Sequence, residues 1–127
     1  MLSRANRLRL ALGLLILPTA TVTAEEIRIL VQRSSLAGSQ FYALDRLAPQ
    51  MRVGDPLTLI REPTNGHDSH AIRVEWHGQQ LGYVPRANNR ALAAAMDRGD
   101  RIVARIKELK SDADPWRRLR FEVFVVL

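Results

Sequence analysis

Residues 71–84 read AIRVEWHGQQLGYV, which is the clearest structural pattern in the sequence. In its first half, the apolar residues Ile72, Val74 and Trp76 alternate with small or charged ones, and this alternation is typical of a half-buried strand. HGQQ at 77–80 is typical of a tight connection, after which apolar residues resume as a second strand. We therefore expect a β-hairpin with one buried face.

The same reasoning places further strands and one helix. In the first strand, Ile27, Ile29 and Val31 are expected to form the more buried face. Residues 85–99 (PRANNRALAAAMDRG) predict an α-helix, because alanines dominate and Gly99 suits its end. Five or six strands and one α-helix predict a mainly β fold, a small OB-like β-barrel. The other strands are expected at 26–32, 56–61, 100–109 and 116–127.

The composition limits the chain to one domain. Its 127 residues are 46% hydrophobic and 25% charged, which is typical of a globular domain and not of a disordered chain. The sequence has no cysteine, so disulfide bonds and thiolate zinc sites are excluded and burial must hold the core together.

Residues 1–24 have the pattern of a secretory leader. Three arginines precede the apolar run LALGLLIL at 10–17, and small residues precede Glu25. The run is much shorter than the about 20 residues of a membrane-spanning helix, so we expect no stable membrane anchor. Cleavage after Ala24 would leave a domain at 25–127, exported to the periplasm or outside the cell. An uncleaved anchor and a misassigned start codon are the alternatives.

Half of the net charge lies in this leader. The whole chain has a formal charge of +6, whereas residues 25–127 hold 16 basic and 13 acidic groups, a net charge of +3. This value is low for a nucleic-acid-binding domain, which is usually strongly basic.

Three motifs follow one another in the rest of the chain: AGSQFY at 37–42, LIREPTNGHDSHAIRV at 59–74 and LGYVPR at 81–86. Together they resemble the HIRAN domain, and the likeness extends over about residues 27–127. The resemblance implies an OB-like barrel that holds the 3′ hydroxyl end of single-stranded DNA. The sequence contains no P-loop of an ATPase motor, so the resemblance is to the isolated module.

The resemblance also implies roles for individual residues. Phe41 and Tyr42 match the aromatic pair that stacks on the terminal bases. Asn65 and Asp68 match loop residues that line the end pocket, and Tyr83 stands where the animal proteins have histidine. These five side chains are candidate DNA-binding residues.

Two positions depart from the pattern of the animal proteins. Gln40 stands in place of an arginine before the aromatic pair, and His67 stands in place of a tyrosine in the loop. A phosphate-facing cation and an aromatic surface are therefore missing, although His67 is kept among the candidate DNA-binding residues.

Each of these assignments has a structural alternative. Rings stack on bases at about 1–3 kcal/mol each, but strand neighbours point to opposite faces, so Phe41 could be core and Tyr42 surface. The Asp68 carboxylate could accept the proton of a terminal hydroxyl and would repel a phosphate. Alternatively, Asn65, Gly66 and Asp68 only build the turn between two strands.

Arginines beside the motifs are candidate phosphate ligands. Arg61, Arg86 and Arg90 lie at the end of a strand and at the start of the predicted helix. A purely solvated role is the alternative for each of them. The arginines at 117–120 alternate with apolar residues, which favours a solvated strand face over an extension of the nucleic-acid path.

The sequence offers one candidate metal cluster and no catalytic motif. His67, Asp68 and His70 are close in sequence, but His77 is the only other histidine, so a closed zinc site lacks ligands. No glycine elbow surrounds a serine nucleophile. We expect no metal, no cofactor and no enzymatic activity.

Two functions are open at this point. The resemblance favours non-catalytic binding of single-stranded DNA ends that carry a free 3′ hydroxyl. Because the leader implies export to a compartment where DNA is seldom met, the alternative is an envelope module of the same barrel. Such a module would bind a protein, a peptide or a glycan.

Overall fold

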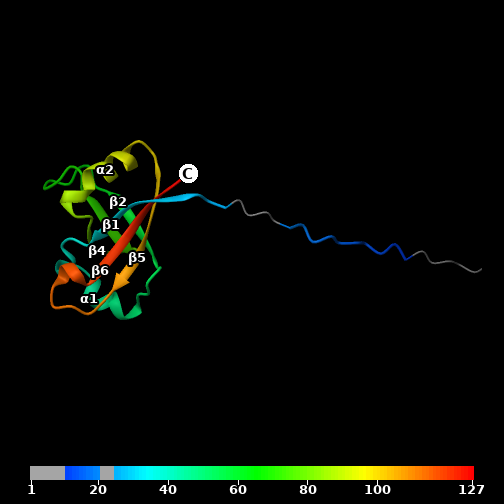
Figure 1. Ribbon diagram of the computed structural model, residues 1–127, viewed down its shortest axis with the longest axis horizontal. Helices are drawn as coiled ribbons and strands as arrows, with labels where there is room; N and C mark the ends of the chain where they lie inside the picture. The colour runs from blue at the N-terminus through cyan, green and yellow to red at the C-terminus, as the bar shows by residue number, and fades with distance from the viewer. Residues whose placement is uncertain (1–10, 21–24) are drawn as a thin grey trace, which may run out of the picture.

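The computed structural model describes residues 11–20 and 25–127 (Figure 1). These residues contain six strands and two α-helices. The strands are β1 (Arg28–Ser35), β2 (Pro56–Arg61), β3 (Ile72–Trp76), β4 (Gln79–Tyr83), β5 (Arg101–Leu109) and β6 (Leu119–Val126). The helices are α1 (Leu44–Leu47) and α2 (Arg86–Asp97), and the 3-10 turns are η1 (Ser39–Phe41), η2 (Ala48–Gln50) and η3 (Pro115–Arg117). The mainly β class predicted from the sequence is confirmed.

All neighbouring strands are antiparallel, in the order β1-β6-β5-β2-β3-β4. β2 joins the two halves of the sheet, because Pro56 and Leu57 pair with β5 and the residues from Thr58 to Arg61 pair with β3. The sheet is not closed, so β1 and β4 form its edges. This arrangement is consistent with the small OB-like β domain predicted from the sequence.

One bridge links the segment after β1 to β4. The backbone N–H groups of Ala37 and Tyr83 each donate to the carbonyl oxygen of the other residue, at 2.9 Å. Gly82 has a φ of +155°, and a Cβ there would clash with the Ala37 carbonyl oxygen and touch Leu36. The glycine of the LGYVPR motif therefore permits the close approach that brings η1 beside β4.

The predicted hairpin is confirmed, with a tighter turn than expected. His77 and Gly78 have φ values of +47° and +76°, as in a two-residue type I′ turn. Gln79 and Gln80 belong to β4 and not to the connection. Ile72, Val74 and Trp76 are buried, as their alternation predicts.

The α-helical content differs from the prediction by one element. The predicted helix is present as α2, which packs on the core through Leu92 and Ala93. The sequence prediction missed α1, whose Leu44 and Leu47 are also buried. Figure 1 shows α1 and α2 at opposite ends of the sheet.

The first strand differs from the prediction in its bounds and in its burial. β1 begins at Arg28 and continues to Ser35, and its first half lies on an edge of the sheet. Ile27, Ile29 and Val31 are 63%, 47% and 51% exposed, so the expectation of a buried face was wrong. Burial begins only where the strand approaches the core, at Ser34.

The last strand starts later than predicted. Residues 116–118 form part of η3 and its cap, because Asp114 caps the Trp116 N–H at 3.0 Å and Pro115 starts the turn. Arg118 does not lie on a solvated strand face, since its guanidinium donates to Asp45 Oδ1 at 2.6 Å. Of the predicted alternating arginines, Arg120 alone lies in β6.

The leader prediction falls largely outside the described residues. Residues 1–10 and 21–24, which include the three arginines and the expected cleavage site, are not described. Of the apolar run, residues 11–17 are exposed and contribute nothing to the core. Within the described ranges, no helix is long and apolar enough to cross a membrane.

Candidate nucleic-acid interface

Two neighbouring aromatic side chains lie on a 3-10 turn at the surface. Gly38 has a φ of +70° and precedes η1, so the chain turns sharply before Phe41. Phe41 is 77% exposed and Tyr42 is 40% exposed, which excludes the alternative that Phe41 is a core residue. Both rings approach Gly38, within 4.0 Å of an ideal Cβ there. The turn therefore places both rings beside Gly38, whereas a strand would point them to opposite faces.

Tyr83 of β4 extends this aromatic surface. Its ring lies edge to face with the Tyr42 ring, with 6.1 Å between the centroids and 63° between the planes. The Tyr83 hydroxyl donates to Glu62 Oε1 at 2.8 Å. Partial burial and this hydrogen bond to a carboxylate raise the pKa of Tyr83, so the phenol stays protonated at neutral pH.

Glu62 connects the aromatic surface to the loop after β2. Its Oε1 also accepts from Asn65 Nδ2 at 3.0 Å, and its Oε2 accepts from Arg73 Nη1 at 3.2 Å. One carboxylate thus fixes two predicted site residues, Asn65 and Tyr83, and an arginine of β3. The sequence reasoning assigned no role to Glu62 or Arg73, although both lie in the motif at 59–74.

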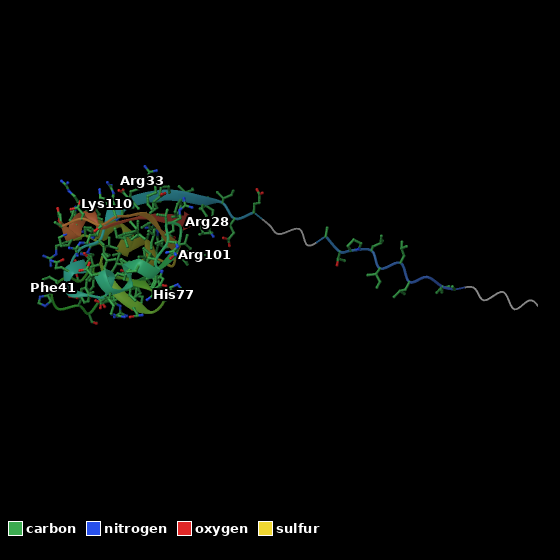
Figure 2. All side chains as sticks on the ribbon, turned by 90° about the horizontal axis from the view of Figure 1, so that it is seen from below. Arg28, Arg33, Phe41, His77, Arg101 and Lys110 are labelled. Carbon is green, nitrogen blue, oxygen red and sulfur yellow. The ribbon has the colours of Figure 1, made fainter. Side chains whose placement is uncertain are left out.

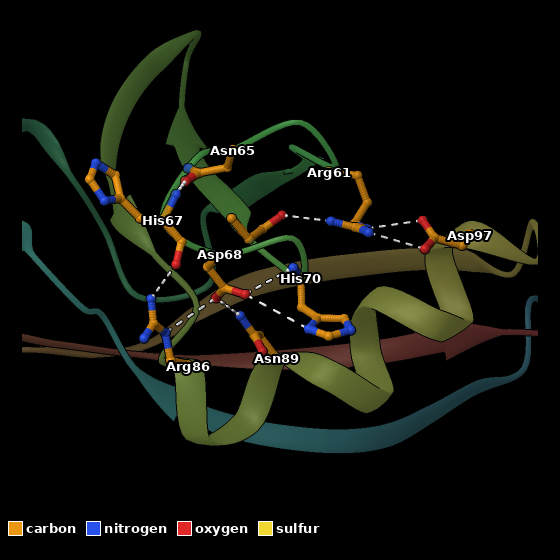
Figure 3. A network of polar contacts seen from close by, with 9 residues as sticks. Arg61, Asn65, His67, Asp68, His70, Arg86, Asn89 and Asp97 are labelled. Atoms are coloured by element: carbon orange, nitrogen blue, oxygen red, sulfur yellow. Dashed lines mark hydrogen bonds and ion pairs between the residues drawn. The ribbon is translucent and has the colours of Figure 1, made fainter.

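The loop itself is built by two side-chain turns, which are drawn in Figure 3. Asn65 Oδ1 accepts from the His67 N–H at 2.9 Å, and Asp68 Oδ1 accepts from the His70 N–H at 2.9 Å. The turn-building role that was the alternative for Asn65 and Asp68 is therefore present. Both side chains keep further hydrogen-bonding capacity, because the Asn65 amide oxygen and each Asp68 carboxylate oxygen have two acceptor sites.

Asp68 also anchors the loop to the start of α2. Its Oδ2 accepts from Nδ2 of the buried Asn89 at 2.7 Å and lies 3.7 Å from Arg86 Nε, and Arg86 Nη2 donates to the His67 carbonyl at 2.6 Å (Figure 3). The His70 N–H, Asn89 and Arg86 together lower the pKa of Asp68. The side chain is 17% exposed, so a charged carboxylate reaches the surface here.

Arg61 has a structural role that the sequence did not indicate. Its guanidinium donates to both oxygens of Asp97 in α2, at 2.9 and 3.1 Å, and to the Ala71 carbonyl at 3.0 Å (Figure 3). Because three of its N–H groups are engaged in this clamp between β2 and α2, we no longer assign Arg61 to a phosphate.

The other candidate cations remain at the surface. Arg86 and Arg90 are both exposed and lie one helical turn apart on α2. His67 is also exposed in the loop beside Arg86. Arg86 and His67 flank Asp68, and Arg90 lies one helical turn beyond Arg86 on α2.

Trp116 is a further exposed aromatic residue, on a turn next to η1, whereas sequence reasoning placed it in a strand. It lies in η3, which packs against η1, and Ser39 Oγ donates to the Pro115 carbonyl at 3.4 Å. The Trp116 side chain is about half exposed. A signal was present in the sequence, since Asp-Pro before Trp116 favours a turn over a strand.

The histidine cluster remains a weak candidate for a metal site. His70 Nδ1 lies 3.8 Å from Asp68 Oδ1. Among the described residues, no group of three or more potential ligands is close enough to hold a metal ion. The expectation of a metal-free domain stays a prediction.

The fold and the site define a class of protein: a small β domain with exposed aromatic rings next to an anchored acidic loop. The chain matches the family model of the HIRAN domain over residues 29–127 and belongs to the HIRAN family. Because the HIRAN domain is a nucleic-acid-binding module, this membership confirms the general expectation from the sequence.

Two solved structures have the same fold. A protein from Lactobacillus plantarum superposes with a TM-score of 0.69 and 24% identity, over 80% of this chain and 98% of that chain. The HIRAN domain of human HLTF superposes with a TM-score of 0.56 and 20% identity, over 78% of this chain and 77% of that chain.

One curated relative shares part of the sequence. A Fanconi-associated nuclease 1 homolog from Oryza sativa subsp. japonica is 40% identical over 53 residues, which is 39% of this chain. The match spans 6% of the length of that relative.

Proposed function

We propose that this domain binds the 3′ hydroxyl end of single-stranded DNA. The observation that carries the proposal is the pair of exposed rings, Phe41 and Tyr42, held on a turn that packs against β4 and η3. Large aromatic side chains exposed on a well-anchored turn offer stacking surfaces for bases, whatever the base sequence. Tyr83 lies beside Tyr42 and widens this surface, and Trp116 lies on η3, which contacts η1.

Asp68 is the proposed contact of the terminal hydroxyl. Its lowered pKa keeps the carboxylate charged at neutral pH, and its oxygens retain acceptor sites beyond those used by His70 and Asn89. A charged carboxylate accepts the proton of a hydroxyl and repels a terminal phosphate. Arg86, beside it, and Arg90, one helical turn further along α2, are the proposed contacts of the phosphate that precedes the terminal nucleotide.

The proposed role is binding without catalysis. Glu62, Asn65 and Asp68 each hold neighbouring elements in place through hydrogen bonds. Such positioning supports a rigid binding surface, in which little conformational freedom is lost when a strand is bound.

Removal of the rings tests this proposal. Phe41→Ala and Tyr42→Ala should each weaken binding of a fluorescent single strand by about 1–3 kcal/mol, the value of one stacked base. Ile27→Ala is the matched control, because Ile27 is also an exposed large apolar residue but lies outside the site. If Phe41→Ala and Tyr42→Ala both bind as well as the control, the exposed rings do not form the interface.

We also propose that the chain is exported after removal of residues 1–24. The basic, apolar and small-residue segments of the leader support this proposal. If DNA binding fails the test above, an exported module for a protein, a peptide or a glycan becomes the better account of the same fold.

A further inference from the structure

Cations gather on one face of the sheet, away from the loop that holds Asp68. This basic face is the outer side of β1, β6 and β5, and its cations are exposed in the structure. In Figure 2, Arg28 and Arg33 lie along one side of the domain, whereas Phe41 and His77 lie on the other. The cations of the basic face are Arg28, Arg33, Arg101, Arg105, Lys107 and Arg120.

Strand register arranges these cations in rows across the sheet. Arg28 and Arg101 both lie opposite Val126. Arg33 and Arg105 both lie opposite Glu122. Arg120 forms the last row, with Ser35 and Glu108 as its cross-strand neighbours. The outer rows, at Val126 and Arg120, are six positions apart along β6, so the rows extend over about 20 Å.

The basic face holds the whole net charge of residues 25–127. Its six cations are accompanied by three acids, Glu26, Glu108 and Glu122, which leaves a net charge of +3. Residues 25–127 have the same net charge, so the ten remaining basic groups and the ten remaining acidic groups cancel. The low overall charge therefore hides a strongly asymmetric distribution.

Glu122 is the central acid of this face and is outnumbered by cations. Its side chain is only 4% exposed and lies 3.8 Å from Arg105 and 3.6 Å from Lys107. Within residues 11–20 and 25–127, neither Arg33 nor Arg120 takes part in a side-chain hydrogen bond or an ion pair. Their charges are available for an anionic partner.

The basic face continues into the aromatic site. A hollow of about 270 Å³ at the Arg120 end is lined by Ser35, Lys110, Arg117 and also Trp116. Trp116 belongs to η3, which contacts the turn that carries Phe41. An aromatic ring also lies within the face, since the Arg105 guanidinium lies 4.8 Å from the centroid of Phe124.

We propose that the basic face binds the phosphate backbone of the same single strand, beyond the terminal nucleotides held at Phe41 and Tyr42. Surfaces that bind single-stranded nucleic acid typically have a line of cations with aromatic rings among them. On this face the cations lie along the direction of the β-strands. This inference rests on the proposed function, because the site at Phe41 sets where the strand starts. From there, the bound DNA strand passes Trp116 and crosses the rows of arginines.

Strands of two lengths test the inference. Binding of strands of about four and about twenty nucleotides, each made with a 3′ hydroxyl and with a 3′ phosphate, is measured by fluorescence anisotropy over a range of salt concentrations. The longer strand should bind more tightly and with a steeper salt dependence. In the Arg33→Ala/Arg120→Ala variant, the slope for the longer strand should fall by about 1.4, since each phosphate contact contributes about 0.7.

The matched control is Arg46→Ala/Arg98→Ala, which removes two exposed arginines from other parts of the surface. It should keep the length dependence of the wild type, and both double variants should keep the wild-type affinity for the short strand. An equal loss of length dependence in the two double variants would overturn the inference. Equal affinity of the wild type for both lengths would also overturn it.

The outcomes separate the basic face from the end site. The longer DNA strand could bind through Arg33 and Arg120 with equal affinity for a 3′ hydroxyl and a 3′ phosphate. That result would support the basic face and contradict the proposed function. If the short DNA strand binds more tightly with a 3′ hydroxyl than with a 3′ phosphate and length has no effect on affinity, the proposed function is supported and the inference on the basic face is contradicted. Binding of phosphatidylglycerol vesicles through Arg33 and Arg120, without any gain for the longer strand, would assign the face to a lipid surface instead.

Discussion

At the scale of single residues, Glu62 holds the site together. Its carboxylate accepts from Tyr83, Asn65 and Arg73, so one side chain joins the aromatic surface, the loop and β3. Loss of this acceptor leaves polar groups of all three partners without a bond in a partly buried place, which is costly. Glu62 therefore influences both stability and binding without contacting DNA in the proposed complex.

Glu62→Ala should lower the free energy of unfolding by about 1–3 kcal/mol, as expected when partly buried hydrogen-bond partners lose their acceptor. Glu62→Gln should lose less, because its amide oxygen can still accept from Tyr83 and Asn65. Urea unfolding measures both, with the exposed Glu108→Ala as control. Equal stability of Glu62→Ala and the wild type would show that this carboxylate does not hold the site.

Asp68 makes stability depend on pH at the acidic end. Its pKa in the folded domain is lowered from the usual 3.8, so the charged form stabilises the fold above that value. This contribution should be lost as the pH falls from about the usual value through the lowered one. Glu26 and Asp97 have lowered pKa values too and act in the same direction.

Asp68→Asn should therefore flatten the pH dependence of unfolding below the usual pKa of aspartate. The buried Asn89 can turn its amide to pair with the new side chain, so the variant should still fold. Urea unfolding at a series of acidic pH values checks this expectation. If the free energy of unfolding of Asp68→Asn falls with decreasing pH as steeply as that of the wild type, Asp68 is not the source of the pH dependence.

At the scale of elements, the site depends on the bridge between Ala37 and Tyr83. This bridge places η1 against β4, and η3 then packs on η1. The aromatic surface is thus assembled from η1 and β4, which are far apart in sequence, and η3 supports η1. Gly82 permits the bridge, because any larger residue would meet the Ala37 carbonyl.

Gly82→Ala should destabilise the domain by about 1–3 kcal/mol from overpacking, with backbone strain in addition, and should weaken DNA binding as the turn detaches. Gly78→Ala is the control, because Gly78 also has a positive φ but has open space around it. Thermal and urea unfolding measure the difference. If both variants lose equal stability, the clash with Ala37 does not matter.

The sequence predicted β3, β4 and α2 well, but it missed α1 and the 3-10 turns and misjudged the burial of β1. Alternation and alanine content identify β3, β4 and α2, because burial on one face sets their patterns. The turn at Phe41 depends on the positive φ of Gly38 and on the contact with β4, neither of which leaves a periodic pattern.

The structure connects several of the predicted site residues, and their roles in binding stay predictions. The resemblance selected Asn65, Asp68 and Tyr83, all of which lie in one connected network around Glu62 and the loop. Arg61 was predicted to bind a phosphate from its place at a strand end, and its pairing with Asp97 was missed because the two residues are 36 positions apart. Long-range pairing of this kind cannot be read from the local sequence.

At the scale of the whole molecule, the distribution of charge matters more than its sum. Residues 25–127 have a net charge of +3, which is low for a nucleic-acid-binding domain. The outer face of β1, β6 and β5 holds all of it. A locally positive surface steers a polyanion even where the whole domain is nearly neutral.

The proposed export predicts the form of the mature chain. Intact-mass measurement of the protein recovered from the exported fraction should give a chain that starts at Glu25. Recovery of the uncleaved chain from the cytosol would contradict export, and would remove the conflict between compartment and DNA binding.

The central claim is that the domain recognises the hydroxyl end of a single strand. The most direct measurement is the affinity of the wild type for two strands of one sequence, one ending in a 3′ hydroxyl and the other in a 3′ phosphate. The account predicts that the phosphate weakens binding by about tenfold or more, because it meets the charged Asp68 in a partly buried place. It also predicts that Asp68→Asn removes most of this preference. Equal affinity of the wild type for the two ends would contradict the account.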